Sequence, residues 1–191
     1  MSGTQPTLFL DRDGTINVDQ VGGYVSRPEL LELLPGAARS LERARDAGFK
    51  LAVITNQAGI GKGLYTIADL ARIHEHLCKL LAHDLGAKNF SFDNIEFCPH
   101  RPDEHCNCRK PHVLMIERAA AKLSSDLSRS FYIGDKDADL LCAASAGVRS
   151  ILVRTGYGRE TEERIRHWDE GRPIAVTDTL AAAVEAAIAE L

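Results

Sequence analysis

Two carboxylates stand one residue apart where the first apolar run of the chain ends. Asp11 and Asp13 directly follow Leu8 to Leu10 in the stretch LFLDRDGTIN. Polar groups also follow three later apolar runs. They are Thr55, Asn56 and Gln57 after the second run, Arg109 and Lys110 at the end of the segment after the third, and Asp135, Lys136 and Asp139 after the fourth. Crowded carboxylates repel one another unless a cation is near, and oxygen ligands of this kind suit Mg²⁺. The pattern predicts a magnesium site beside a phosphoryl group held by Thr55 and Lys110. For any single Asp, and for Asp137 above all, a helix cap or a turn is the plainer interpretation.

The elements that would position these groups alternate between short apolar runs and helix-patterned stretches. The expected strands are 7–10, 50–55, 94–97, 130–134 and 150–153, and the expected helices are 36–47, a stretch from Thr66 through Leu81, 112–123, 137–146 and 179–191. Continuous apolarity indicates strands buried on both faces. The alternation predicts an α/β fold with a parallel sheet and helices on both faces. In such a sheet the carboxyl ends of the strands meet at one edge, where ligands bind.

The composition is that of an ordinary soluble protein. The 191 residues suit one domain, 1–191, and 45% of them are hydrophobic and 26% charged. A net charge of -4 gives no reason to expect nucleic acid or an anionic membrane as a partner. Neither a signal peptide nor a membrane-spanning run is visible, so we expect a cytoplasmic protein, with a monomer as the default state. The polar run 159–172, with Trp168, is expected to be an exposed connection.

A cysteine-rich segment, CPHRPDEHCNC, precedes Arg109 and Lys110. Cys98, His100, Cys106 and Cys108 are a complete tetrahedral ligand set for Zn²⁺. The alternatives are a disulfide or incidental thiols, and His105 is a rival ligand in the same loop. Because the protein would fill every coordination position, such a zinc would be structural. It would order the loop 98–110 and so hold Arg109 and Lys110 in place.

These motifs together resemble the haloacid dehalogenase (HAD) superfamily. DRDGT is similar to its first motif, D-x-D-G-T. Thr55 in TNQ is similar to the second, Lys110 to the third, and GDKDAD, through Asp135 and Asp139, to the fourth. The resemblance covers most of the chain and implies a three-layer, Rossmann-like HAD fold.

The resemblance also implies a mechanism. Asp11 would attack phosphorus to form an aspartyl phosphate, and Asp13 would protonate the leaving oxygen and then activate water. Mg²⁺ would be held by the Asp11 carboxylate, the Asp13 backbone carbonyl and Asp135, with Asp139 supporting the site. An Asp at position 13 is what a phosphatase or phosphomutase needs, whereas dehalogenases and P-type ATPases lack it.

Two groups within this superfamily combine a minimal cap with a C-x-H…C-x-C zinc loop. They are the D-glycero-D-manno-heptose 1,7-bisphosphate 7-phosphatases of nucleotide-activated heptose biosynthesis and the histidinol-phosphate phosphatases. Segments 17–34 and 98–111 leave room for a flap and a zinc loop but not for a cap domain. TNQAGIGKG, CRKPH and GDK resemble the heptose group more, which implies a small phosphorylated sugar as substrate. The implied substrate contacts are Arg12, Asp19, Gly23, Tyr24, Asn56, Gln57, Arg109 and Lys136.

Some features depart from this interpretation or leave alternatives open. DQVGGY is longer than the DHGY-like form of the heptose group, which affects the expected flap contacts. GIGKG lacks the Gly and the Ser/Thr of a Walker loop, and Lys62 within it could reach a distal substrate group or remain solvated. His74, His76 and His83 are expected to be surface or core residues. A nucleic-acid-binding module on a retired scaffold, or a phosphotransferase, are alternative functions; the acidic charge and the complete motif set count against the first.

Overall fold

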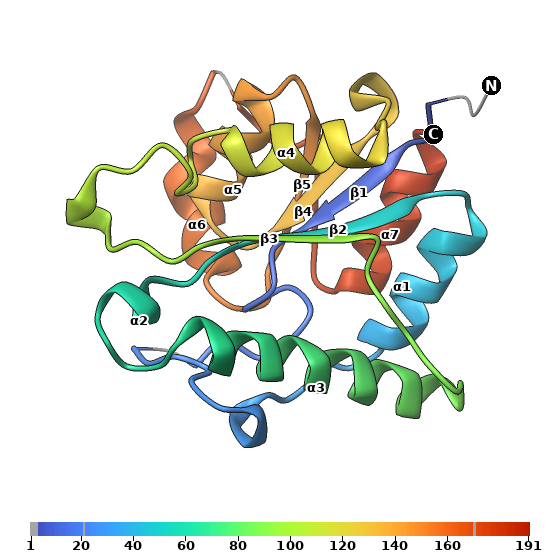
Figure 1. Ribbon diagram of the computed structural model, residues 1–191. Helices are drawn as coiled ribbons and strands as arrows, with labels where there is room; N and C mark the ends of the chain where they lie inside the picture. The colour runs from blue at the N-terminus through green and yellow to red at the C-terminus, as the bar shows by residue number, and fades with distance from the viewer. Residues whose placement is uncertain (1–3, 21, 170) are drawn as a thin grey trace.

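A six-stranded parallel sheet forms the centre of the protein in a computed structural model that describes residues 4–20, 22–169 and 171–191 (Figure 1). The strand order is β3-β2-β1-β4-β5-β6, and every neighbouring pair is parallel. The strands are β1 (Thr7–Leu10), β2 (Lys50–Asn56), β3 (Asn94–Cys98), β4 (Phe131–Gly134), β5 (Arg149–Val153) and β6 (Ala175–Thr177). The predicted parallel α/β architecture is confirmed.

Helices cover both faces of the sheet. The α-helices are α1 (Ala37–Asp46), α2 (Ala58–Gly61), α3 (Ile67–Leu85), α4 (Leu114–Leu123), α5 (Asp137–Ser145), α6 (Gly158–Arg164) and α7 (Leu180–Ala189). Short 3-10 helices are η1 (Pro28–Leu30), η2 (Pro102–Glu104), η3 (Leu127–Arg129) and η4 (Ile165–His167). One core lies between the sheet and α1, α3 and α7, and a second lies under α4 and α5. Figure 1 shows these helices on opposite sides of the sheet.

The two cores explain why the strands read as continuous apolar runs. Along β1, Leu8 and Leu10 belong to the first core while Phe9, between them, belongs to the second. Successive side chains of a strand point to opposite faces, so a strand covered on both sides has no position that faces solvent. All residues of β1 and β4 are buried.

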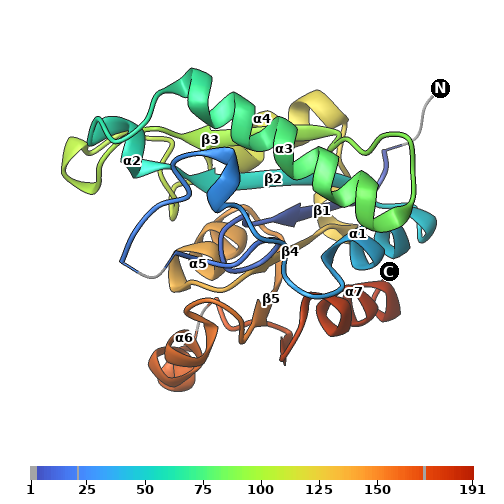
Figure 2. The ribbon, with the colours of Figure 1, turned by 90° about the horizontal axis from the view of Figure 1, so that it is seen from below.

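The order of the strands places the site. The direction of strand succession reverses at β1, which lies between β2 and β4. In open α/β sheets the crevice beyond the carboxyl ends at such a switch point binds ligands. Asp11 follows β1 and Asp135 follows β4, so the two lie side by side at this crevice. Figure 2 shows the described residues of segment 17–34, here called the flap, and α2 at the same end of the sheet.

Several expected elements are confirmed, and one expectation is corrected. The five expected strands and five expected helices are present, and Thr66 and Asp69 form a capping box at the start of α3. Segment 159–172 is not simply an exposed connection, because it contains most of α6 and all of η4. Ile165 there is only 5% exposed and packs with Leu140 and Leu152. β6 was not expected from the sequence. Val21, within DQVGGY, and residues 1–3 lie outside the described residues.

No helix in the described residues is long and apolar enough to cross a membrane.

Candidate active site

A pocket of about 570 Å³ opens at the carboxyl ends of the strands. Its size is within the range usual for small-molecule sites. The structure brings together most of the predicted site residues along its wall: Asp11, Asp13, Asp19, Gly23, Tyr24, Thr55, Asn56, Gln57, Arg109, Lys110 and Lys136. Arg12 and Asp135 do not line it, and both are fully buried beside it.

A buried lysine joins two of the carboxylates. Lys110 Nζ lies 2.8 Å from Asp11 Oδ1 and 2.7 Å from Asp139 Oδ1, and all three side chains are almost entirely buried. Burial alone would lower the pKa of Lys110, but the two carboxylates outweigh it and raise that pKa. Burial raises the pKa of Asp11, while Lys110 acts in the opposite direction. The lysine is therefore a fixed positive charge beside the predicted nucleophile.

Asp135 has the properties expected of a cation ligand. Its Oδ2 accepts a hydrogen bond from the Tyr157 backbone N–H at 2.8 Å, but its buried Oδ1 has no partner among the described residues. Burial raises the pKa of Asp135 well above its usual value. An unpartnered buried carboxylate oxygen is costly unless a cation binds it. Ligand oxygens of Asp11, Asp135 and Asp139 lie within 4.8 Å of one another, so these residues fit Mg²⁺.

Asp139 is committed to other partners. It accepts from the Lys136 backbone N–H at 3.0 Å, which caps α5, and it also pairs with Lys110. These contacts agree with the predicted supporting role of Asp139.

Gly14 leaves space for the Asp135 carboxylate: its φ is +86°, and a Cβ there would collide with that carboxylate. The glycine of DRDGT is thus required by both conformation and space.

Asp13 is held from three directions. Arg12 Nη2 donates to both its oxygens at 2.9 and 2.8 Å, Asn17 Nδ2 donates at 2.9 Å, and Gln57 Nε2 donates at 2.9 Å. Burial raises the pKa of Asp13, but the Arg12 guanidinium and these hydrogen bonds outweigh it, so the pKa lies below its usual value. The Asp13 side chain is 18% exposed and lines the pocket.

The end of β2 supplies hydrogen bonds that fix the other groups. Gln57 Nε2 also donates to Thr55 Oγ1 at 2.8 Å, which links the predicted phosphoryl-binding hydroxyl to Asp13. The Asn56 side chain bonds the backbone of Lys110 twice: Oδ1 accepts from its N–H at 3.1 Å and Nδ2 donates to its carbonyl at 3.3 Å. Asn56 therefore fixes where the loop before α4 meets the sheet.

Cationic side chains surround the mouth of the pocket. Lys136 Nζ is 2.9 Å from Asp19 Oδ2, which joins the start of α5 to the flap, the segment 17–34. Lys62 Nζ lies 5.3 Å from the centre of the Tyr24 ring. Arg109 Nη1 donates to the His100 carbonyl at 3.4 Å. Within the described residues, neither Lys62 nor Arg109 is paired with a carboxylate.

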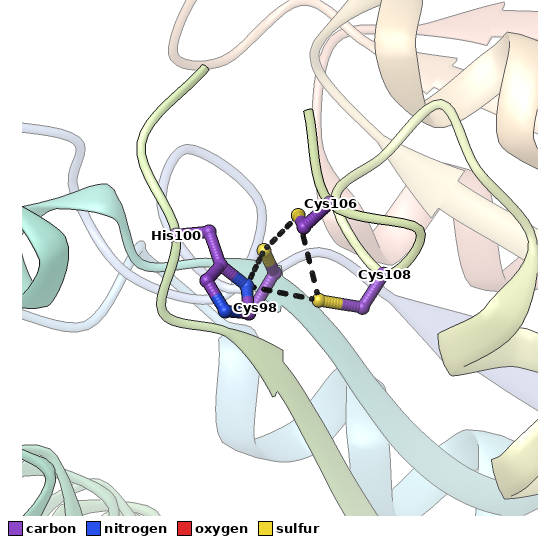
Figure 3. Close-up of side chains that lie close together, drawn as sticks. All are labelled: Cys98, His100, Cys106 and Cys108. Carbon is purple, nitrogen blue, oxygen red and sulfur yellow. Dashed lines mark hydrogen bonds between the residues drawn. The ribbon is translucent and has the colours of Figure 1, made fainter. Parts of the chain in front are cut away.

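The cysteine-rich loop forms a compact cluster (Figure 3). Cys98 Sγ lies 3.5 Å from Cys106 Sγ and 3.6 Å from His100 Nδ1, and Cys108 Sγ lies 3.7 Å from Cys106 Sγ and 3.3 Å from His100 Nδ1. Ligands about 2.3 Å from a tetrahedral zinc would be about 3.8 Å apart, so the spacing fits that ion. A disulfide would need about 2.05 Å, and all of these cysteines are free. His105 is not one of the clustered residues.

His74 and Tyr65 near the site were not identified from the sequence as functional residues, and Arg12 differs from its predicted role. The fully buried Arg12 guanidinium lies against Asp13, His74 and Gln57 and does not line the pocket, so its side chain supports Asp13 and the predicted substrate contact is corrected. Tyr65 Oη donates to Gln57 Oε1 at 2.6 Å. One signal existed for His74, since it lies one turn beyond Leu70 on the buried stripe of α3.

Comparison with known proteins identifies the family. The chain is 44% identical over 155 residues to D-glycero-beta-D-manno-heptose-1,7-bisphosphate 7-phosphatase of Helicobacter pylori strain J99, covering 81% of this chain and 86% of that protein. The chain belongs to the HAD-like hydrolases. A family model described as HAD-hydrolase-like matches residues 107–183. The Chlorobaculum tepidum D-glycero-D-manno-heptose-1,7-bisphosphate 7-phosphatase is 43% identical, with 81% of each chain covered.

A solved structure agrees with this family assignment. D,D-heptose 1,7-bisphosphate phosphatase from B. bronchiseptica, complexed with magnesium and phosphate, superposes with a TM-score of 0.85 at 34% identity, covering 97% of this chain and 99% of that one. The HAD resemblance drawn from the four motifs is confirmed, and this HAD-like hydrolase is a phosphoric monoester hydrolase. The roles of its individual residues stay predictions.

Proposed function

We propose that the protein removes the 7-phosphate of D-glycero-D-manno-heptose 1,7-bisphosphate through an aspartyl phosphate on Asp11. The observation that carries the proposal is the pairing of the Asp11 carboxylate with the buried Lys110 ammonium group, with Asp13 held at the same pocket. The names of the relatives at 43–44% identity support this choice of substrate.

The reaction needs two carboxylates with different tasks. One oxygen of Asp11 attacks phosphorus as the bond to the substrate oxygen breaks. Asp13, whose pKa is low in the free site, takes up a proton when the phosphate anion binds beside it and then gives that proton to the leaving oxygen. Asp13 then takes a proton from water, which attacks the phosphorus of the aspartyl phosphate and returns the Asp11 carboxylate. Lys110 and Thr55 hold the transferring group and offset its negative charge.

Two metal ions complete the proposal. Mg²⁺, when bound by the Asp11 carboxylate, the Asp13 backbone carbonyl and Asp135, would neutralise charge on the phosphoryl oxygens. The unpartnered Oδ1 of Asp135 supports this site. Zinc at Cys98, His100, Cys106 and Cys108 would be structural, since all four coordination positions are filled.

The charges at the pocket mouth favour a bisphosphate over histidinol phosphate. Asp19 is paired with Lys136 and Asp137 with Arg164, which leaves Lys62 and Arg109 as cations without a carboxylate partner in the described part of the chain. A second phosphate at this end of a substrate would be attracted by them, whereas the ammonium group of histidinol phosphate would be repelled. The polar lining suits a small phosphorylated sugar.

Phosphate release in the presence of Mg²⁺ tests the proposal directly. The values of kcat/KM for the heptose bisphosphate and for histidinol phosphate should differ by at least about a hundredfold in favour of the heptose, or about 2.7 kcal/mol. A preference for histidinol phosphate would overturn the substrate while keeping the chemistry. Failure of Asp11→Asn to abolish phosphate release would overturn the chemistry itself.

A further inference from the structure

A fully buried arginine connects the acid–base candidate to the long helix α3. The Arg12 side chain is not exposed to solvent, and its Nη2 binds both oxygens of Asp13. At its other end, Nη1 lies 3.2 Å from His74 Nε2. The guanidinium therefore spans the distance between the pocket and the face of α3 that carries the apolar stripe.

The chemistry of the two groups fixes the direction of the contact with His74. A guanidinium has only donors, so His74 Nε2 must accept, and the imidazole must be neutral with its proton on Nδ1. Burial and the adjacent Arg12 charge lower the pKa of His74 to about 3, in agreement with a neutral ring. His74 thus acts as a fixed acceptor at a position where an aliphatic side chain would provide none.

We propose that His74 is a positioning residue for the phosphatase reaction: by accepting from Arg12 Nη1 it holds the guanidinium that orients the Asp13 carboxylate toward the leaving oxygen. The inference rests on the proposed role of Asp13 as general acid. Without an acceptor at position 74, the buried Nη1 loses its partner, and the guanidinium gains freedom to turn away from Asp13. Because Asn17 and Gln57 also bind Asp13, the loss should be partial.

Dependence on the leaving group distinguishes a misplaced acid from a damaged protein. An alkoxide must be protonated as it leaves, whereas nitrophenolate leaves without help. The value of kcat/KM reports steps only through the first irreversible one, here the transfer to Asp11, so hydrolysis of the aspartyl phosphate does not affect it. The experiment compares the heptose bisphosphate with p-nitrophenyl phosphate in wild type, His74→Leu, His74→Gln and His83→Leu, the last exposed on the same helix.

We expect His74→Leu to lower kcat/KM about tenfold for the heptose bisphosphate and less than about twofold for p-nitrophenyl phosphate. His74→Gln, which retains an acceptor, should recover most of the loss, and His83→Leu should match wild type. Equal losses on both substrates, or no loss on either, would overturn the proposal. If His74→Leu does not fold, His74→Asn replaces it, with a shorter acceptor that cannot reach Arg12 in the same way.

Asp13→Asn provides the separate test of the underlying mechanism. It should show the same substrate-dependent loss, only larger. If Asp13→Asn lowers kcat/KM equally for both substrates, Asp13 is not the general acid and the proposed mechanism fails independently of His74. If only the His74 variants lack the substrate dependence, the mechanism stands and the positioning role is wrong.

Discussion

Acid should destabilise this protein through His74. The pKa of His74 is lowered from 6.5 to about 3 by burial and by Arg12, with Asp13 opposing. In the unfolded chain the ring has its ordinary pKa and binds a proton below pH 6.5. In the folded protein the same ring stays neutral down to about pH 3. The unfolded state therefore binds more protons between about pH 3 and pH 6.5, and stability must fall as the pH falls through this window.

The size of the effect follows from the two pKa values. Protonation of this one imidazole stabilises the unfolded chain by about 1.36 kcal/mol for each pH unit below 6.5. Between pH 7.5 and pH 5.0 the free energy of unfolding therefore falls by about 2 kcal/mol because of His74. Above about pH 7.5 the contribution is constant. Replacement by glutamine removes the titrating ring while keeping an acceptor for Arg12, so His74→Gln should lose about 2 kcal/mol less than wild type on acidification.

Urea unfolding at pH 7.5 and pH 5.0 measures this difference. Protonation of other groups, including the cluster of Cys98, His100, Cys106 and Cys108, is common to both proteins and cancels in the comparison. His83→Gln, exposed on the same helix, should behave as wild type. Parallel pH dependence in wild type and His74→Gln would refute the reasoning, because it would mean that the ring is not held neutral in the folded protein.

Three further predictions concern the reacting groups, the cysteine cluster and the glycine beside Asp135. Asp11→Asn should lower phosphate release at least about a thousandfold with unchanged circular dichroism, because the amide is no nucleophile; a smaller loss would place the nucleophile elsewhere. Cys106→Ser should lower both zinc content by elemental analysis and Tm, whereas Cys78→Ser, outside the cluster, should keep them; equal zinc in both would contradict the ligand set. Gly14→Ala should raise the Mg²⁺ concentration needed for half-maximal kcat, since its Cβ collides with Asp135; an unchanged value would contradict this.

The convergence of the site could be predicted because it depends on few physical rules. Parallel strands buried on both faces must read as apolar runs, and their carboxyl ends must share one edge of the sheet. That reasoning alone placed Asp11, Thr55 and Asp135 together. The cysteine cluster could be predicted as well, because three cysteines and a histidine within eleven residues suit zinc regardless of the conformation of the loop.

Other features depend on contacts that a linear pattern does not contain. β6 is only three residues long and half-buried at an edge, and α6 is dominated by charged residues, so neither has a strong apolar signature. The direction of the Arg12 side chain was also hidden. Its neighbours Asp11 and Asp13 line the pocket, whereas the Arg12 side chain is fully buried and does not line it, so a residue predicted to contact the substrate instead holds the Asp13 carboxylate.

The ion pair between Lys136 and Asp19 has a consequence for the flap when a substrate is bound. An ammonium group has three N–H donors, and Lys110 already pairs with two carboxylates at once, so Lys136 has donors left for a substrate phosphate while it keeps Asp19. A phosphate bound by Lys136 would then be linked through this one side chain to both the start of α5 and the flap.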